Sequence, residues 1–417
     1  MSKPQRNRIA LVDASSLPSI ITVTTATARI MNKRNYLDQA ATSFPKPEEV
    51  YTAVEDYSRH LGSAVGRSGY RTATKVQTTV DRCRKKIADF LGAESANRIV
   101  FTFNGTDSLN LAIHGLLQER DHVITTVCEH NSVLRPLNTL KRSKNVELTV
   151  LDADSQGRVN PQDVKQAVQS QTKLVVMTHA SNVTGSIQPL EQVGDICREN
   201  DLVFLVDAAQ TVGHLPIDLR NLPVDLLAAP GHKGLLGPLG TGILYLRSGM
   251  EDRIASLRQG GTGTNSEQDT QPDELPQKYE SGNHNAPGIC GLEKAVDFLL
   301  ERGIENLRQH EIRLTELLLD RLKSIPNIIV PGTVEAQHRV GVISVTVNEM
   351  EPQIVSSILD ESFGIETRAG LHCAPLMHHA MGTDLLGGTV RFSIGPFTTE
   401  EEIEVASKAL ASICQSV

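Results

Sequence analysis

The feature of this sequence that most constrains its fold is an alternation of short apolar runs with amphipathic segments, which begins near residue 97. The runs are rich in β-branched residues and apolar on both faces, as strands buried inside a parallel sheet must be. The segments between them, such as SLNLAIHGLLQ and PLEQVGDICREN, have helical periodicity. The alternation predicts right-handed βαβ units, and therefore an α/β fold with a mostly parallel, doubly wound sheet. The five runs are RIVFTF, HVITTV, VELTVL, KLVVMT and LVFLVD.

The length of the chain requires more than one core. A single hydrophobic core stops growing at roughly 250–300 residues, and this chain has 417. We expect a large α/β domain over 35–285 and a smaller α+β domain over 286–417, with residues 35–60 free to pack against the smaller one. Residues 258–285 are rich in Gly, Thr and polar side chains, which is typical of a long surface loop or an interface segment. In the smaller domain we predict helices at 288–302, 304–325 and 351–362, strands near 340–347 and 389–394, and a final helix that starts at Thr399.

Charge and cysteine usage argue against several classes of protein. The net charge of −8 and the pI near 5.9 speak against a surface for nucleic acid or for an anionic membrane, because both require basic patches. No apolar run approaches the roughly 20 residues of a membrane span. The six cysteines form no CxxC pair and no dense framework, which indicates free thiols in a reducing, cytoplasmic compartment.

The first 34 residues differ in composition from the rest of the chain. They are basic, rich in Ser and Thr, and contain one acidic residue, Asp13. Asp13 and Pro18 interrupt the apolar stretch, so the segment does not have the form of a signal peptide. We expect either a disordered extension or a translation start at Met31.

In doubly wound sheets ligands bind beyond the carboxyl ends of the strands, so the residues that follow each strand are the candidates for a site. Lys233 follows the strand-like run VDLLAA in the glycine-rich segment AAPGHKGLLGPLGTG, with His232 beside it. A lysine in a partly desolvated loop has a pKa below the free value of about 10.4, which suits a Schiff base, although a solvated loop lysine is the alternative. Asp207 ends the run LVFLV, where an acid can pair with the pyridinium nitrogen of pyridoxal phosphate or act as a turn residue.

Three other strand ends carry polar residues of the same kind. Gly105, Thr106 and Asp107 end one strand and open a helix, where free N–H groups favour an anion such as a phosphate, or form an ordinary helix cap. His130 follows HVITTV and could stack on a flat ring, and Asn182 follows KLVVMT. Together these strand ends predict a pyridoxal-phosphate site.

The segment RAGLHCAP places Cys373 after Gly370 and before Pro375, which predicts a turn or loop. A thiol there could pack, form a disulfide, bind a metal or act as a nucleophile. The neighbouring histidines 372, 378 and 379 have no CxxC or HExxH spacing, so we expect no metal site.

Over roughly residues 36–413 the chain resembles the class V aminotransferase superfamily of fold-type I pyridoxal-phosphate enzymes. Within it, the sequence is most similar to the cysteine desulfurases that have a short catalytic-cysteine segment. The resemblance implies a fold-type I architecture, pyridoxal 5′-phosphate as cofactor and a homodimer. The residues that carry it are YLDQAAT (36–42), NGTDSLNL, EHNSV, SNVTG, DAAQ, GHKGLLGP, YESGN (279–283) and RAGLHCA.

For the cofactor ring, the resemblance implies four contacts. Lys233 is the Schiff-base lysine, and Asp207 pairs with the ring nitrogen. Gln210 hydrogen-bonds the ring oxygen. His130 stacks on the ring and assists proton transfer.

For the cofactor phosphate, the resemblance implies that Thr106 and His232 bind together with N–H groups of residues 105–107. The sequence departs from the family pattern at two positions. Pro230 stands where a Ser or Thr usually binds the phosphate, and Asn283 replaces a Thr that reaches the phosphate from the partner subunit. Asn can still donate a hydrogen bond, whereas Pro cannot.

For the substrate, the resemblance implies that Asn182, which also contacts the cofactor, binds the carboxylate with Arg391, and that Arg368 lies close by. Cys373 is then the nucleophile that takes sulfur from L-cysteine as a persulfide and leaves L-alanine. Its thiolate requires neighbouring cations, and we expect Arg368 and His372 to supply them. A selenocysteine lyase, or an aminotransferase or lyase for another amino acid with Cys373 incidental, are the alternatives. A separate sulfur-acceptor protein is a plausible partner.

Overall fold

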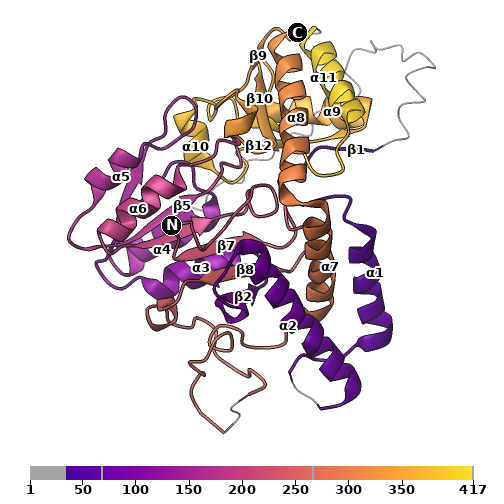
Figure 1. The fold of residues 1–417 in the computed structure, drawn as a ribbon. Helices are drawn as coiled ribbons and strands as arrows, with labels where there is room; N and C mark the ends of the chain where they lie inside the picture. The colour runs from indigo at the N-terminus through magenta and orange to yellow at the C-terminus, as the bar shows by residue number, and fades with distance from the viewer. Residues whose placement is uncertain (1–33, 67–68, 265–266, 416–417) are drawn as a thin grey trace, which may run out of the picture.

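The computed structural model describes residues 34–66, 69–264 and 267–415. A seven-stranded sheet with helices on both faces forms the larger part, and the C-terminal residues form a second, smaller layered unit beside it (Figure 1). The extension predicted at 1–34, apart from Arg34, and the alternative start at Met31 lie outside the described residues.

The large sheet has the strand order β2-β8-β7-β6-β5-β3-β4. Strands β7, β6, β5, β3 and β4 pair in parallel, whereas β8 is antiparallel to both β7 and β2. The prediction of a mostly parallel sheet is confirmed, and each of the five predicted runs contains a strand. The strands are β2 (Ile99–Thr102), β3 (His122–Thr126), β4 (Glu147–Leu151), β5 (Thr172–Thr178), β6 (Val203–Asp207), β7 (Leu226–Pro230) and β8 (Gly242–Leu246).

Both faces of the large sheet are buried, because alternate residues of each strand point to opposite sides. In β5, Leu174 and Val176 pack with helices α3 and α4, while Val175 and Met177 belong to the cluster that includes α2, α6 and α7. The sheet is therefore the middle of three layers. The helices are α2 (Arg71–Leu91), α3 (Gly105–Leu116), α4 (Asn131–Ser143), α5 (Pro161–Ala167), α6 (Leu190–Glu199) and α7 (Ala286–Arg302).

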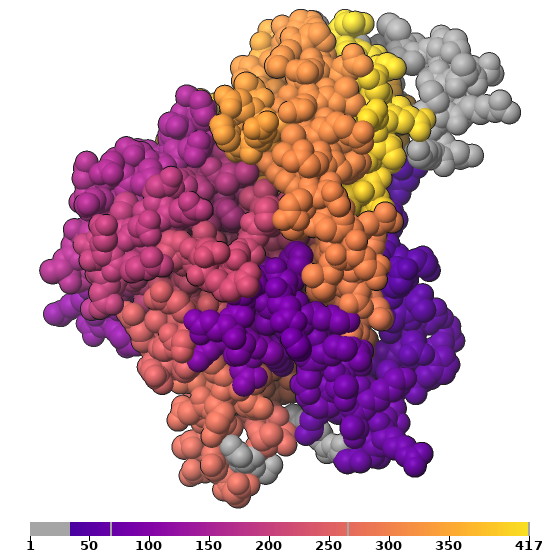
Figure 2. All heavy atoms as spheres, in the orientation of Figure 1, coloured from indigo at the N-terminus to yellow at the C-terminus, as the bar shows by residue number. Residues whose placement is uncertain are grey.

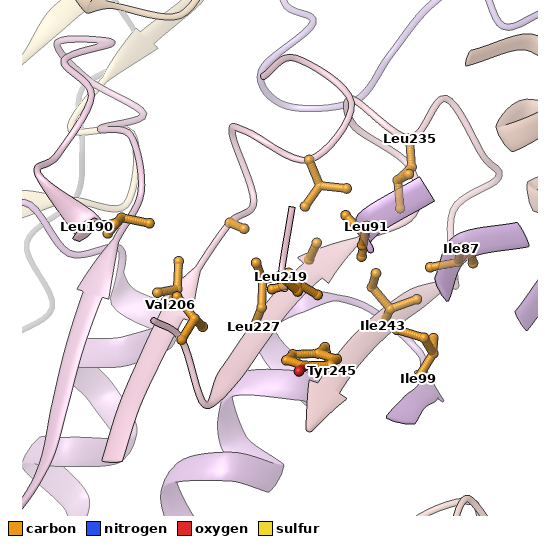
Figure 3. Packing of buried hydrophobic residues seen from close by; sticks show 14 of the residues in the cluster. Ile87, Leu91, Ile99, Leu190, Val206, Leu219, Leu227, Leu235, Ile243 and Tyr245 are labelled. Carbon is orange, nitrogen blue, oxygen red and sulfur yellow. The ribbon is translucent and has the colours of Figure 1, made fainter. Parts of the chain in front are cut away.

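Helix α2 covers one end of the large sheet. Ile87 and Leu91 of this helix lie close to Ile243 and Tyr245 of β8 in the apolar cluster (Figure 3), and all four side chains are buried. Burial of an Ile or Leu side chain contributes about 1.5–3 kcal/mol, so this face anchors α2 firmly to the sheet.

The C-terminal unit is built on an antiparallel sheet of order β12-β13-β10-β9. Its own apolar cluster joins this sheet to three helices. Thr399 and Glu402 cap the last helix reciprocally, since each main-chain N–H donates to the other side chain, as the sequence predicts. The elements are α8 (Ile304–Lys323), β9 (Ile328–Ile329), β10 (Val342–Val347), α9 (Pro352–Phe363), β12 (Arg368–Gly370), α10 (Pro375–Ala380), β13 (Thr389–Ser393) and α11 (Glu400–Gln415).

The N-terminal residues of the described chain contact both units. Strand β1 (Asn35–Tyr36) pairs in parallel with β11 (Ile365–Glu366), so residues 35 and 36 lie with the C-terminal unit. Helix α1 (Glu48–Asp56) and helix α7 pack side by side against the large unit. Figure 2 shows the C-terminal residues, orange to yellow, as an upper lobe on the larger body. The domain boundaries proposed above stay a prediction.

Residues 258–285 contain no helix or strand among those that the structure describes, as the composition predicts. No described helix is both long and apolar enough to span a bilayer.

Candidate functional site

A cavity lies at the carboxyl ends of five strands of the large sheet. The loops after β2, β3, β5, β6 and β7 all reach it, as expected for a doubly wound sheet. Most of the sequence-predicted cofactor residues meet there. The lining residues are Asn104, Gly105, Thr106, Leu109, His130, Ser132, Thr178, Asn182, Asp207, Ala209, Gln210, Pro230, His232 and Lys233.

Lys233 and Asp207 face the same cavity from neighbouring strands. Burial lowers the pKa of Lys233 to about 8, although the carboxylate of Asp207 opposes the shift. Burial likewise raises the pKa of Asp207, against the opposing effects of an N–H donated by Ala209 at 3.0 Å and the charge of Lys233. The lysine therefore has far more free amine near neutral pH than an ordinary lysine, as suits a Schiff-base lysine.

His130 is the N-cap of α4, and its ring is fixed by the first turn of that helix. The main-chain N–H of Ser132 donates to Nδ1 at 3.0 Å. Burial, together with the charge of Lys233, lowers the pKa of His130 to about 4. The imidazole is thus neutral at physiological pH with its proton on Nε2. The hydroxyl of Ser132 also contacts Thr106 Oγ1 at 2.7 Å, which links this ring to the start of α3.

The N-terminus of α3 forms one wall of the cavity. Asn104 caps the helix by accepting the N–H of Asp107 at 2.9 Å. The Asp107 side chain does not line the cavity and pairs with Arg258 at 2.9 Å, so only its main-chain N–H remains for the predicted phosphate contact, which stays a prediction. Gly105 lies against Pro230, since a Cβ on this glycine would be 3.1 Å from the proline Cδ.

His232 and Gln210 are placed differently within the same cavity. Burial lowers the pKa of His232 to about 4, and its Nδ1 has no partner among the described residues. This neutral, unsatisfied ring nitrogen is available to a ligand. Gln210 is buried, and its amide donates to the carbonyl of Ala40 at 3.1 Å.

Asn283 lines a second hollow beside this one, together with Phe103, Gly240 and Arg258. Its side chain is exposed, and it does not line the cavity of its own chain. A contact between Asn283 and a ligand of Lys233 in the same subunit is therefore not indicated.

Two arginines lie opposite each other on neighbouring strands, Arg368 on β12 and Arg391 on β13. Arg391 is only 1% exposed, and it donates to Asp38 Oδ1 at 2.8 Å and to the carbonyl of Asn182 at 3.2 Å. Arg368 donates to Cys373 Sγ at 3.5 Å. The predicted carboxylate site and the thiol thus share one small region.

Cys373 lies on a turn between β12 and α10, as the sequence predicts, and is half-buried. The prediction that His372 supplies positive charge beside it is wrong. Burial lowers the pKa of His372 to about 2, and Nε2 lies 2.9 Å from Thr389 Oγ1. His372 is therefore a neutral structural residue, and Arg368 is the cation in contact with the thiol.

The sequence did not reveal several residues of this region. Glu129 is fully buried, and its Oε1 accepts from Thr126 Oγ1 at 2.7 Å and from the N–H of Thr178 at 3.0 Å. Burial raises the pKa of Glu129 to about 8. Asp38 and Ser132 were also not assigned a role, although both belong to motifs that carry the resemblance. An acid or hydroxyl inside such a motif is the signal that could have identified them.

Pyridoxal 5′-phosphate fits these residues. The cavity combines an amine of lowered pKa, a buried carboxylate, a neutral stacking ring and the free amides of a helix N-terminus. The unpartnered Nδ1 of His232 adds a polar group that a ligand can satisfy. Pro230 contributes no donor, so the phosphate would rely on Thr106, His232 and the amides of α3.

The comparisons with known proteins agree with this site. Residues 35–405 match the family model for class-V aminotransferases. A probable cysteine desulfurase from Methanothermobacter thermautotrophicus is 37% identical over 383 residues, covering 91% of this chain and 94% of that protein. A cysteine desulfurase from Haloferax volcanii is 31% identical over 376 residues, covering 88% and 87%.

Solved structures of cysteine desulfurases are also similar to this chain. The apo structure of a cysteine desulfurase from Thermococcus onnurineus NA1 superposes with a TM-score of 0.86 at 29% identity, covering 95% of this chain and 100% of that chain. The cysteine desulfurase CsdA from Escherichia coli, solved as the S-sulfonic acid form, gives a TM-score of 0.83 at 25% identity, covering 94% and 99%. On sequence, fold and site together, this chain belongs to the class-V aminotransferase family.

Proposed function

We propose that this chain is a pyridoxal-phosphate-dependent cysteine desulfurase that converts L-cysteine to L-alanine and takes the sulfur onto Cys373. The observation that carries the proposal is the attachment of the Cys373 turn to the cavity of Lys233. The side chain of Asn182, which lines that cavity, donates to the carbonyl of His372 at 2.7 Å. The one half-buried thiol of the described chain is thereby held beside the lysine site.

When bound, pyridoxal phosphate supplies an electron sink that weakens bonds at the substrate Cα and Cβ. Lys233 would hold it covalently, Asp207 would pair with its ring nitrogen and His130 would stack on its ring. Since Asp207 is buried next to Lys233, it can hold a proton at that nitrogen without competition from solvent.

The chain's own side chains account for proton movement and for substrate orientation. Lys233, with its pKa near 8, can accept the Cα proton once its amine is released. Arg391 is a buried guanidinium whose Nε has no partner among the described groups, so it has capacity for a carboxylate. The amide of Asn182 lies on the same side, since Arg391 donates to the Asn182 carbonyl.

The sulfur-transfer step involves two thiols, that of the substrate and that of Cys373. The Cβ–S bond of the substrate breaks, and a new S–S bond forms to Cys373 Sγ, which becomes a persulfide. The substrate carbon takes up a proton and leaves as alanine. Arg368 donates to the attacking sulfur at 3.5 Å and so helps to orient it.

Product analysis tests this function. Purified protein with L-cysteine should yield alanine and protein-bound sulfane sulfur in equal amounts during the first turnover. A parallel reaction with L-selenocysteine measures the preference for selenium over sulfur. Transamination products, or alanine without any persulfide on the protein, would contradict a desulfurase in which Cys373 is the acceptor.

We further propose that the chain forms a homodimer whose interface includes residues 258–285. Large apolar side chains are exposed here: Phe103, which lines the same hollow as Asn283, is 46% exposed, and Leu239, which precedes the lining residue Gly240, is 64% exposed. Such side chains together indicate a protein interface. From there Asn283 could reach the phosphate in a partner subunit. Sedimentation at working concentration tests this, and an active monomer would contradict it.

The partial exposure of the Cys373 thiol supports transfer of its sulfur to a separate acceptor protein. The half-buried Cys373 precedes α10, and Leu371 beside it is 41% exposed. A persulfide at this position is accessible to a second protein. Transfer of labelled sulfur from the persulfide form to candidate acceptors measures this step.

A further inference from the structure

The Cys373 turn, which we define as Leu371–Ala374, has an unusual backbone. The N–H of Ala374 donates to the carbonyl of Leu371 at 2.9 Å and closes a four-residue turn. His372 and Cys373, its two central residues, have φ values of 48° and 60°. Glycine, asparagine and aspartate favour this left-handed conformation, whereas histidine and cysteine adopt it rarely. The turn therefore needs support from outside itself.

That support comes from two hydrogen bonds made by loops of the large sheet. The main-chain N–H of Asn131 donates to the carbonyl of Cys373 at 2.7 Å. The side-chain amide of Asn182 donates to the carbonyl of His372, also at 2.7 Å. Both donors lie just beyond the carboxyl ends of strands, so the turn is bound across the boundary between the two units.

The two bonds differ in how easily they are released. The Asn182 amide belongs to a side chain that faces the cavity, and a substrate carboxylate there would compete for it. The Asn131 N–H is at the first position of α4 and has no acceptor within its own helix. It is therefore free to keep its bond to Cys373 when the cavity is filled.

We propose that Asn131 is a positioning residue, whose main-chain N–H holds the Cys373 thiol at the cavity while the Asn182 amide turns to the substrate. The proposal rests on the desulfurase function, because it concerns the thiol assigned there as sulfur acceptor. His130, the ring that would stack on the cofactor, directly precedes Asn131. The thiol and the stacking ring are thus anchored to the same helix N-terminus.

A proline substitution deletes this N–H and puts its ring Cδ where the hydrogen was, so the carbonyl of Cys373, 2.7 Å from the nitrogen, must also move away. Proline is favoured at the first position of a helix, and the residue before it must be extended. Asn131 occupies that position, and His130 has φ −70° and ψ 154°. Asn131→Pro should therefore fold and lose the bond to Cys373. Asn131→Ala is the matched control, since it shortens the side chain and keeps the N–H.

The rate of alkylation of Cys373 by iodoacetamide in cofactor-free protein measures how firmly the turn is held. The other cysteines of the chain, Cys83, Cys128, Cys197, Cys290 and Cys414, are buried, so alkylation reports on Cys373. Loss of one hydrogen bond shifts the equilibrium of the turn by about 5-fold. We expect Asn131→Pro to be alkylated at least about 5-fold faster than the wild type and Asn131→Ala at the wild-type rate. Equal rates for the three proteins would overturn the proposal.

A second pair of variants keeps the idea testable if Asn131→Pro does not fold. Asn182→Ala should also speed alkylation in cofactor-free protein, while Gln210→Ala, which removes another amide from the same cavity, should not. Addition of L-alanine to the loaded enzyme diverts the Asn182 amide, so it should speed alkylation of Asn131→Ala no more than Asn182→Ala does, and it should speed alkylation of Asn131→Pro further. Acceleration by Gln210→Ala equal to that of Asn182→Ala would contradict the role of the turn contacts. The cofactor-free measurement requires no turnover, so it can fail or succeed independently of the desulfurase activity.

Discussion

Glu129→Gln should stabilise the protein above about pH 6, and the gain should grow from there to pH 8. Glu129 is fully buried, and its Oε2 has no hydrogen-bond partner among the described residues. A wholly buried carboxylate with one bare oxygen is costly when ionised, which agrees with a pKa raised by burial to about 8. The glutamine side chain of the variant would keep an oxygen for Thr126 and Thr178 without ever carrying the charge.

The size of the effect follows from the difference in pKa between the folded and unfolded states. Glutamate titrates near 4.5 in the unfolded chain and near 8 here, so between these values the unfolded chain is ionised and the fold holds a neutral acid. Raising the pH therefore favours unfolding of the wild type by about 1.4 kcal/mol per pH unit. At pH 7 this amounts to about 3 kcal/mol, from which about 1–2 kcal/mol is subtracted for an amide N–H₂ that lacks an acceptor.

Denaturant unfolding of cofactor-free protein at pH 5, 6, 7 and 8 measures this, with wild type and variant side by side. Glu311→Gln is the matched control, because Glu311 is also buried but its pKa is held low by His214 and Arg308 despite its desolvation. That variant should be less stable than the wild type at every pH of this range, because the carboxylate is the favoured form of Glu311 in the fold. A Glu129→Gln difference that is constant with pH, or that has the sign of the control at pH 7 and 8, would show that Glu129 is ionised in the fold.

Three further substitutions probe the site. Lys233→Ala should abolish the absorbance of covalently held cofactor, and a variant that kept this absorbance would place the linkage elsewhere. Arg391→Lys should raise the KM for cysteine by about 10-fold or more, because one ammonium cannot replace the separate N–H groups that contact Asp38 and Asn182; an unchanged KM would remove Arg391 from the carboxylate site. Asn283→Ala should weaken retention of pyridoxal phosphate on dialysis while kcat at saturating cofactor stays near that of the wild type, and unchanged retention would argue against a contact from the partner subunit.

The fold was predictable where local pattern and topology coincide. The strands that end at Thr126, Thr178 and Asp207 were recognisable because a strand buried on both faces must be apolar throughout. Strand β8 was missed, since it is antiparallel and interrupts the alternation on which the prediction was built. Helix α2 was missed although its buried residues, such as Val76, Val80 and Ile87, recur at helical spacing.

The candidate site was predictable to a similar extent. Residues at the ends of parallel strands must meet at one edge of the sheet, so Asp207 and His130 could be placed together from the sequence. The pairing of Asp38 with Arg391 depends on the path of the N-terminal strand into the C-terminal unit, which no local pattern reveals. His372 was wrongly expected to be charged, because its burial depends on contacts with residues distant in the sequence, such as Asn182.

Cys373→Ser tests the central claim most directly. Serine keeps the size of the side chain and its place beside Arg368, but it removes the nucleophilic thiolate. With L-cysteine as substrate, we measure alanine production and persulfide on the protein, with Cys197→Ser as a control at a buried cysteine. The account predicts that Cys373→Ser still changes the cofactor absorbance on mixing with cysteine, carries no persulfide and makes alanine at least about 100-fold more slowly. Alanine production at the wild-type rate, with persulfide still formed on the protein, would show that Cys373 is not the sulfur acceptor.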